Sequence, residues 1–258
     1  MKIRPPVVAA NIGFMFLLVV GIAAHAAEIK VLSAGGIREV MQDLGPKFER
    51  ASGHSLSITF AAPGAIVQRV LGGEINDVVI LTKAGIDSLL KDGKAVAGNV
   101  TALARSGIGV AVRKGAPKPD ISSPEALKRT LLAARSITYS NPASGATSGV
   151  HFAKVLDELG IASEMKPKTV FSPKGVVGEL AANGEAEIAV HQFQELIPVV
   201  EIEIVGPLPG DLQDAIVFSA AIMGSARNAA VAKELVDFLR APEASAVIKA
   251  KGMEPAIP

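Results

Sequence analysis

Hydrophobic and polar positions along this chain change repeatedly from a strand pattern to a helix pattern. Residues 137–140 alternate apolar and polar, and apolar residues then recur at helical spacing until Gly160 ends the helix. The residues between these two segments are almost all small. The same order of strand, small-residue loop and helix is expected three more times, at residues 28–53, 55–71 and 169–181.

The remaining segments extend this pattern to the whole chain. Residues 77–81 form a continuous apolar run, which indicates a strand covered by helices on both faces. Pro46 is expected to kink or divide the helix that ends near Gly53. The order of elements therefore favours an α/β protein with mostly parallel strands. Further strands are expected at 107–112, 187–191, 200–205 and 214–223, and further helices at 84–92, 122–134, 229–239 and 242–251.

The loop between residues 140 and 150 has the composition of an anion-binding site. Ser144, Thr147 and Ser148 offer hydroxyl groups, and Gly145 and Gly149 let a ligand approach the backbone amides that open the helix. These amides and the positive end of the helix dipole favour an anion. The simpler alternative is that the loop only joins a strand to a helix, as in any α/β protein.

The N-terminal residues have the features of a secretory signal peptide. Lys2 and Arg4 precede an apolar run over residues 12–24, and residues 24–26 form a small-x-small cleavage signal. We expect removal of residues 1–26 and export of the rest. A retained membrane anchor is the alternative, but the apolar run is short for a helix that spans a bilayer.

Composition and charge exclude several classes of protein. The chain has 258 residues, 49% hydrophobic and 20% charged, which suits one large globular unit or two lobes. Removal of residues 1–26 takes away Lys2 and Arg4 and leaves 24 basic against 25 acidic residues, so neither nucleic acid nor an anionic membrane is an expected partner. The chain has no cysteine, and no pair of histidines has metal-ligand spacing. We therefore expect no metal and no cofactor, and we expect a monomer.

Four segments of the chain carry a family resemblance. They read Val-Leu-Ser-Ala-Gly-Gly-Ile at 31–37, Thr-Phe-Ala-Ala-Pro-Gly at 59–64, Asp-Val-Val-Ile at 77–80 and Phe-Leu-Arg-Ala-Pro-Glu-Ala at 238–244. Together they resemble the periplasmic molybdate-binding proteins of ABC importers, in the same order and over essentially the whole mature chain. The resemblance implies a periplasmic protein with the type II periplasmic-binding-protein fold. In that fold two α/β lobes with mostly parallel sheets are joined by two crossovers, and a ligand cleft lies between them.

The same resemblance implies where the lobes are divided. The crossovers are expected near 106–108 and 214–217. Lobe 1 would then contain residues 27–107 and 216–258, and lobe 2 would contain residues 108–215.

The resemblance also implies ligand contacts. The family holds a tetrahedral oxyanion with serine hydroxyls, backbone amides and a tyrosine hydroxyl. By position, the serines fall on Gly36 and near residues 62–63, which offer no hydroxyl, and the tyrosine falls on His191. A valine amide of the family falls on or near Val176. With the small-residue loops added, the expected ligand contacts are Ser33, Gly35, Gly36, Ala62, Pro63, Gly64, Ser144, Gly145, Thr147, Ser148, Lys174, Val176 and His191.

Two further phrases suggest a divergent branch of this family. Gly-Ala-Pro-Lys-Pro-Asp-Ile at 115–121 and Thr-Leu-Leu-Ala-Ala at 130–134 are similar to a periplasmic aconitate isomerase. Such an enzyme shifts a double bond by moving a proton between two carbons of a tricarboxylate. It needs a general base and acid beside the ligand, whose carboxylates are held by amides.

His191 is the best candidate for chemistry because it ends an expected strand, and ligands of open α/β sheets lie beyond the carboxyl ends of strands. It could donate a hydrogen bond to an oxyanion or accept a proton. The alternative is a hydrogen-bonded polar residue at a strand end. Lys174 would attract a polycarboxylate, although solvated loop lysines are more common. His151 and Tyr139 are interpreted as structural.

These observations leave two hypotheses open. The first is a periplasmic solute-binding protein that captures a small anion, a molybdate-like oxyanion or a small carboxylate, and delivers it to the membrane subunit of an ABC importer. The second is an isomerase of a small tricarboxylate such as aconitate, in which His191 or the nearby Glu195 moves the proton. A binder needs donors and no base, whereas an isomerase needs a titratable group that faces the substrate carbon.

Overall fold

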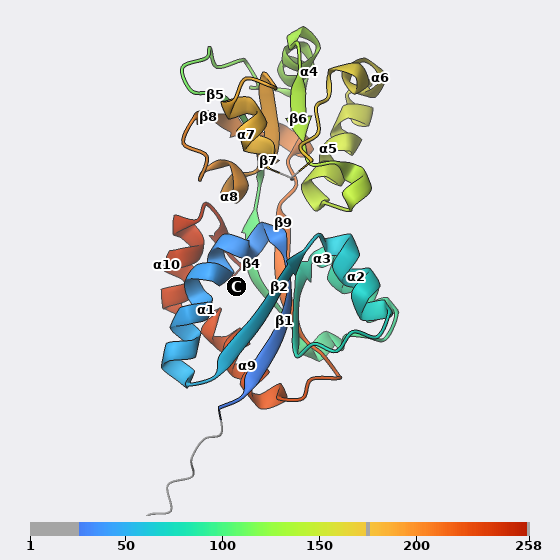
Figure 1. The fold of residues 1–258 in the computed structure, drawn as a ribbon. Helices are drawn as coiled ribbons and strands as arrows, with labels where there is room; N and C mark the ends of the chain where they lie inside the picture. Colours follow the sequence, from blue (N-terminus) through green and yellow to red (C-terminus); the bar gives the residue numbers. More distant parts are fainter. Residues whose placement is uncertain (1–25, 174–175, 257–258) are drawn as a thin grey trace, which may run out of the picture.

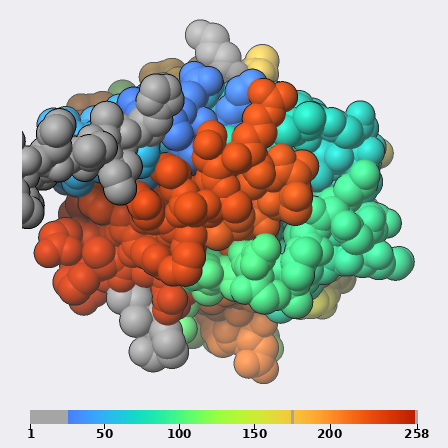
Figure 2. Space-filling view, turned by 90° about the horizontal axis from the view of Figure 1, so that it is seen from below, coloured from blue at the N-terminus to red at the C-terminus, as the bar shows by residue number. Residues whose placement is uncertain are grey.

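The computed structural model of the protein describes residues 26–173 and 176–256, and these form two α/β lobes stacked end to end (Figure 1). Each lobe contains one β-sheet with helices packed on its faces. Seen from below (Figure 2), the C-terminal residues in red and orange lie against N-terminal residues in blue. Both ends of the described chain therefore build the same lobe.

The first sheet has six strands in the order β10-β4-β9-β3-β1-β2. β1, β2 and β3 are parallel, and β9 is antiparallel to both β3 and β4, so β4 runs in the direction of the first three. Helices α1 and α10 lie on one side and α2 and α3 on the other (Figure 1). The bounds are β1 Glu28–Ala34, β2 Ser55–Ala61, β3 Val78–Thr82, β4 Val100–Ser106, β9 Ile216–Ile222, β10 Glu254–Pro255, α1 Arg38–Ser52, α2 Pro63–Leu71, α3 Lys83–Lys91, α9 Ala229–Phe238 and α10 Pro242–Ala250.

The second sheet has four strands in the order β6-β7-β5-β8. β6 and β7 are parallel, and β5 is antiparallel to both β7 and β8, so β8 runs in the direction of β7. The bounds are β5 Ile108–Arg113, β6 Ile137–Tyr139, β7 Ile188–Gln192, β8 Ile202–Pro207, α4 Pro124–Ala133, α5 Thr147–Glu158, α6 Ala162–Met165, α7 Val177–Ala182 and α8 Phe193–Leu196. Most strands of each sheet thus share one direction, which confirms the expected α/β fold.

The chain passes from the first sheet to the second at Gly107 and returns over residues 208–215. The side chain of Gln213 joins these two segments, because its Oε1 accepts from the Ile108 amide (2.9 Å) and its Nε2 donates to the Ile108 carbonyl (2.8 Å). The expected crossovers at 106–108 and 214–217 overlap these connections at residues 107 and 214–215. The exact lobe boundaries stay a prediction.

One expectation from the sequence is wrong, and a second is wrong in part. Residues 169–171 do not form a strand of the sheet; they make an isolated bridge between Thr169 and Ile137. Pro46 does not divide its helix, because α1 runs through it from Arg38 to Ser52, and the expected kink stays a prediction. The apolar face of α1, which includes the buried Leu44 and Phe48, packs on the lobe and offsets the hydrogen bond that a proline cannot donate.

The expected signal peptide at residues 1–26 lies almost wholly outside the described residues. Across 26–173 and 176–256, no helix combines the length and the apolar character that crossing a membrane requires.

Candidate functional site

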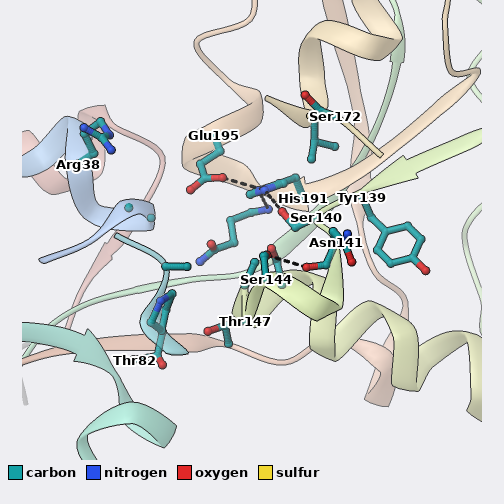
Figure 3. Close-up of a pocket in the computed structure, with 18 of the residues that line it drawn as sticks. Arg38, Thr82, Tyr139, Ser140, Asn141, Ser144, Thr147, Ser172, His191 and Glu195 are labelled. Atoms are coloured by element: carbon teal, nitrogen blue, oxygen red, sulfur yellow. Dashed lines mark hydrogen bonds and ion pairs between the residues drawn. The ribbon is translucent and has the colours of Figure 1, made fainter. Parts of the chain in front are cut away.

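A cavity of about 630 Å³ lies between the two lobes, and residues of both lobes line it (Figure 3). This volume is in the range of sites that hold small organic ligands. The first lobe contributes Gly35, Gly36, Arg38, Ala61, Ala62, Pro63, Thr82 and Phe218. The second lobe contributes Tyr139, Ser140, Asn141, Ser144, Ala146, Thr147, Ser148, Phe171, Ser172, Pro173, Val177, His191, Gln192 and Glu195.

Several helices begin at this cavity with backbone amides that no side chain caps among the described residues. The positions before the first helical residue are Ala62 for α2, Thr82 for α3 and Ala146 for α5, and the 3₁₀ turn Gly35–Ile37 leads into α1 in the same way. By contrast, α4 begins away from the cavity, and its Ser123 accepts a hydrogen bond from the Ala126 amide (3.1 Å). Helix starts without a side-chain cap also occur elsewhere, at α9 and α10. Several helix N-termini therefore point free backbone amides and the positive ends of their dipoles at one cavity. This arrangement makes the site suitable for an anion.

His191 lies at the end of β7, is only 3% exposed and is held by three hydrogen-bonding groups. Its Nδ1 accepts from the main-chain amide of Gln192 (2.8 Å), which assigns the proton of the neutral ring to Nε2. Nε2 lies 2.8 Å from Glu195 Oε2 and 2.7 Å from Ser140 Oγ (Figure 3). The histidine therefore orients the carboxylate of Glu195.

Glu195 faces the cavity with about a third of its side chain (34%) exposed. Burial acts to raise the pKa of this carboxyl, but the interaction with His191 and the charge of Arg38 outweigh burial and hold the pKa below its usual range. The guanidinium of Arg38 itself lies over the ring of Phe60, 4.3 Å from the centroid. Glu195 is therefore ionised at neutral pH and can accept a proton.

Ser140 does not complete a serine-protease-like triad. Such a triad needs the hydroxyl and the carboxylate on opposite nitrogens of the imidazole. Here both Ser140 and Glu195 contact Nε2, and Nδ1 is occupied by a backbone amide. The arrangement favours proton transfer by the carboxylate over nucleophilic attack by the serine.

The small-residue loop before α5 is held by its own hydrogen bonds. Asn141 Oδ1 accepts from the Ala143 amide (3.0 Å), and the Ser144 hydroxyl donates to the Asn141 carbonyl (2.7 Å). Ser144 uses its proton within the loop. The amides and the hydroxyl of Thr147 remain as donors at the start of α5.

The structure brings many of the expected contacts together at the cavity. Those that line it are Gly35, Gly36, Ala62, Pro63, Ser144, Thr147, Ser148 and His191. Their contact with a ligand stays a prediction.

Other expected contacts lie elsewhere. Ser33 does not line the cavity, because it is fully buried on β1 and its hydroxyl donates to the Ala34 carbonyl (3.3 Å). Gly64 and Gly145 meet at the edge of the cavity, since a Cβ built on Gly64 would lie 3.6 Å from Gly145 Cα. Val176 lines an adjacent cavity of about 550 Å³, which shares His191 with the first. Lys174 lies outside the described residues.

Sequence reasoning did not single out several polar residues of the site. Thr82 ends β3, Ser140 follows β6 and Gln192 ends β7. The rule that pointed to His191, that ligands lie beyond the carboxyl ends of strands, would have found all three. The described residues offer no group of three or more histidine, cysteine or acidic side chains that could hold a metal ion.

Comparison with known proteins agrees with this fold. The pattern of the family described as bacterial extracellular solute-binding protein matches residues 29–254, so the chain belongs to this family. Its fold is that of the type II periplasmic binding proteins. A solved structure of this fold, the periplasmic molybdate-binding protein of Azotobacter vinelandii, has a TM-score of 0.71 at 23% identity and covers 89% of this chain and 99% of that one.

Two curated relatives are similar over most of their length. An aconitate isomerase of a Pseudomonas species is 34% identical over 239 residues, which cover 90% of each protein. The molybdate-binding protein ModA of Azotobacter vinelandii is 28% identical over 236 residues, which cover 89% of this chain and 91% of the relative.

Proposed function

We propose that this protein is a periplasmic isomerase of a small tricarboxylate, with aconitate as the candidate substrate. The observation that carries the proposal is the carboxylate of Glu195, which lies 2.8 Å from His191 Nε2 in a cavity where helix N-termini converge. A protein that only captures an oxyanion has no use for a proton acceptor there. The similarity to an aconitate isomerase supports the same function.

Glu195 is the proton acceptor in this proposal. With Nδ1 occupied and a proton on Nε2, neutral His191 has no free lone pair to act as the base. Glu195 takes a proton from the methylene carbon of the bound tricarboxylate, and the electron pair left behind forms a double bond to the central carbon. The former double bond moves its electrons to the far carbon, which receives the proton back from Glu195. No oxidant or second substrate is required.

A carboxylate of low pKa is a weak base, so the site must lower the energy of the carbanion. The negative charge of that intermediate spreads onto the oxygens of the neighbouring carboxylate. Donors already aimed at those oxygens stabilise it without reorganisation. The amides at the starts of α2 and α5 and at the Gly35–Ile37 turn are placed to do this.

The test is an NMR assay of aconitate in deuterium oxide. We expect the protein to interconvert the two aconitate isomers and to introduce solvent deuterium. Glu195→Gln should slow this exchange about 10²- to 10⁴-fold, the range for loss of a general base. Glu179→Gln is the matched control, because Glu179 is an exposed acid that lines only the adjacent cavity. Absence of exchange in the unaltered protein would contradict the proposal.

The second candidate function is capture of a small anion for an ABC importer. Membership of the solute-binding family favours it, as do the uncapped helix starts at the cavity. Thermal unfolding with molybdate, tungstate, sulfate and both aconitate isomers separates the two. Stabilisation by molybdate but not by aconitate would favour the importer function.

A further inference from the structure

The side chain of Gln192 is buried in the site with an unused hydrogen-bond donor. Gln192 is the last residue of β7, is only 5% exposed and lines the cavity. Its main-chain amide is bonded to His191, but its side-chain Nε2 has no partner within the described residues. Leaving such a donor unpaired costs free energy, so native proteins rarely keep one without a reason.

Two other buried polar groups lack a partner in the described part of the chain, and neither lines the cavity. They are Asn76 Nδ2 and Thr138 Oγ1. Gln192 alone among the three combines an unpaired donor with a place in the cavity wall. This combination is typical of a group that is satisfied by a ligand.

The first lobe packs closely against the Gln192 carboxamide. A Cβ built on Gly36 would lie 3.0 Å from Gln192 Oε1 and 2.7 Å from Phe218 Cζ, so the amide oxygen packs closely against the turn before α1. Any side chain at position 36 would displace it. Gln192 belongs to the second lobe, and this contact brings its amide to the junction of both lobes.

We propose that Gln192 Nε2 donates a hydrogen bond to one carboxylate of the ligand and is a specificity-determining residue for a polycarboxylate. The substrate class rests on the proposed isomerase function. One carboxylate would be held by Gln192 while the amides at the helix starts hold another, which places the methylene carbon beside Glu195. A site built around such a donor discriminates against ligands that leave it unpaired.

The test compares Gln192→Met with Thr138→Val. Each replaces a buried polar side chain that has no partner by an apolar one of similar size, but only Gln192 lines the cavity. Without ligand, neither variant should lower the melting temperature. Calorimetry with tricarballylate, a saturated tricarboxylate that cannot isomerise, should show 10- to 100-fold weaker binding for Gln192→Met and unchanged binding for Thr138→Val, as expected for loss of a hydrogen bond to a charged group.

Gln192→Glu provides a second variant of the same size. Its carboxylate would repel the ligand, so tricarballylate affinity should fall by more than in Gln192→Met. Either variant that folds and binds tricarballylate as tightly as the unaltered protein would overturn the role of Gln192.

The outcomes also separate this role from the isomerase proposal. Deuterium exchange by the unaltered protein, with full affinity in Gln192→Met, would leave the isomerase standing and remove Gln192 from recognition. Weaker binding by Gln192→Met without any exchange by the unaltered protein would support the role of Gln192 and overturn the isomerase. Failure of the unaltered protein to bind tricarballylate would overturn the role of Gln192, whereas the isomerase proposal would still be decided by deuterium exchange.

Discussion

The charge state of Glu195 determines how the proposed reaction depends on pH. Its pKa lies below the usual value, because His191 and Arg38 outweigh the effect of burial. A base must be deprotonated, so activity should be present above this pKa and be lost as pH falls through it. The acid limb of the pH profile of kcat/KM should therefore lie below the ordinary pKa of a glutamate.

His191→Gln tests the origin of that low pKa. Glutamine removes the imidazole that lowers this pKa, so burial should then raise the pKa of Glu195 and move the acid limb to higher pH. His151→Gln is the control, because His151 bonds to the Leu212 carbonyl (2.8 Å) and does not line the cavity. An acid limb that stays in place in His191→Gln would show that the histidine does not set this pKa.

Single residues of the site could be predicted only in part from the sequence. The position of His191 at the site follows from the expected strand at residues 187–191 and from the rule that ligands lie beyond the carboxyl ends of strands. The hydrogen-bond partners of His191 cannot be predicted in this way. The contact with Glu195 depends on the direction in which α8 leaves β7, and the contact with Ser140 depends on the pairing of β6 with β7. The unpaired amide of Gln192 becomes visible only when every neighbour is placed.

The position of helix α5 requires a residue without a side chain at Gly149. A Cβ there would lie 2.0 Å from the Ser140 carbonyl oxygen, which is backbone and cannot rotate away. The helix start therefore contacts the end of β6 directly. This contact sets where the amides of Thr147 and Ser148 point.

Gly149→Ala should displace the start of α5. We expect a loss of about 1–3 kcal/mol in the free energy of unfolding, the usual cost of overpacking, together with weaker tricarballylate binding. Urea denaturation and calorimetry measure the two effects. Gly98→Ala is the control, since nothing lies within 4 Å of a Cβ at that position. Equal stability of both variants would show that α5 can move freely.

The sequence predicts an element correctly where a local pattern of apolar residues is sufficient. The prediction is wrong or missing where strand formation depends on pairing with a strand that is distant in the sequence. The buried run of β3 and the helical faces of α2 and α9 need no partner to be recognised. Residues 169–171 are expected to form a strand, but Thr169 pairs only with Ile137, so the segment makes a bridge in place of a strand. The sequence reading missed β4, which depends on pairing with the distant β9 and β10.

At the scale of the whole molecule, Gln194 on α8 connects the two lobes. Its Nε2 donates to the Gly36 carbonyl (2.8 Å) in the first lobe, and its Oε1 accepts from the hydroxyl of Ser106 at the end of β4. Because Glu195 is the next residue, the same short helix carries the proposed base and the contact between lobes.

Gln194→Met should loosen this connection. Without ligand, we expect a larger radius of gyration by small-angle X-ray scattering and a several-fold loss of affinity for tricarballylate. Gln68→Met, at an exposed position on α2, is the control. Scattering curves that coincide for the variant and the unaltered protein would show that other contacts hold the lobes together.

Gly64 and Gly145 approach each other from opposite lobes, and a Cβ on Gly145 would lie 3.3 Å from Gly64 Cα. Main chain thus touches main chain beside Pro63 and Ala146, which both line the cavity. One flank of the entrance is therefore closed by polypeptide backbone alone. Solutes must therefore enter and leave by the remaining flanks, and no side-chain rotation at these two glycines can open the closed one.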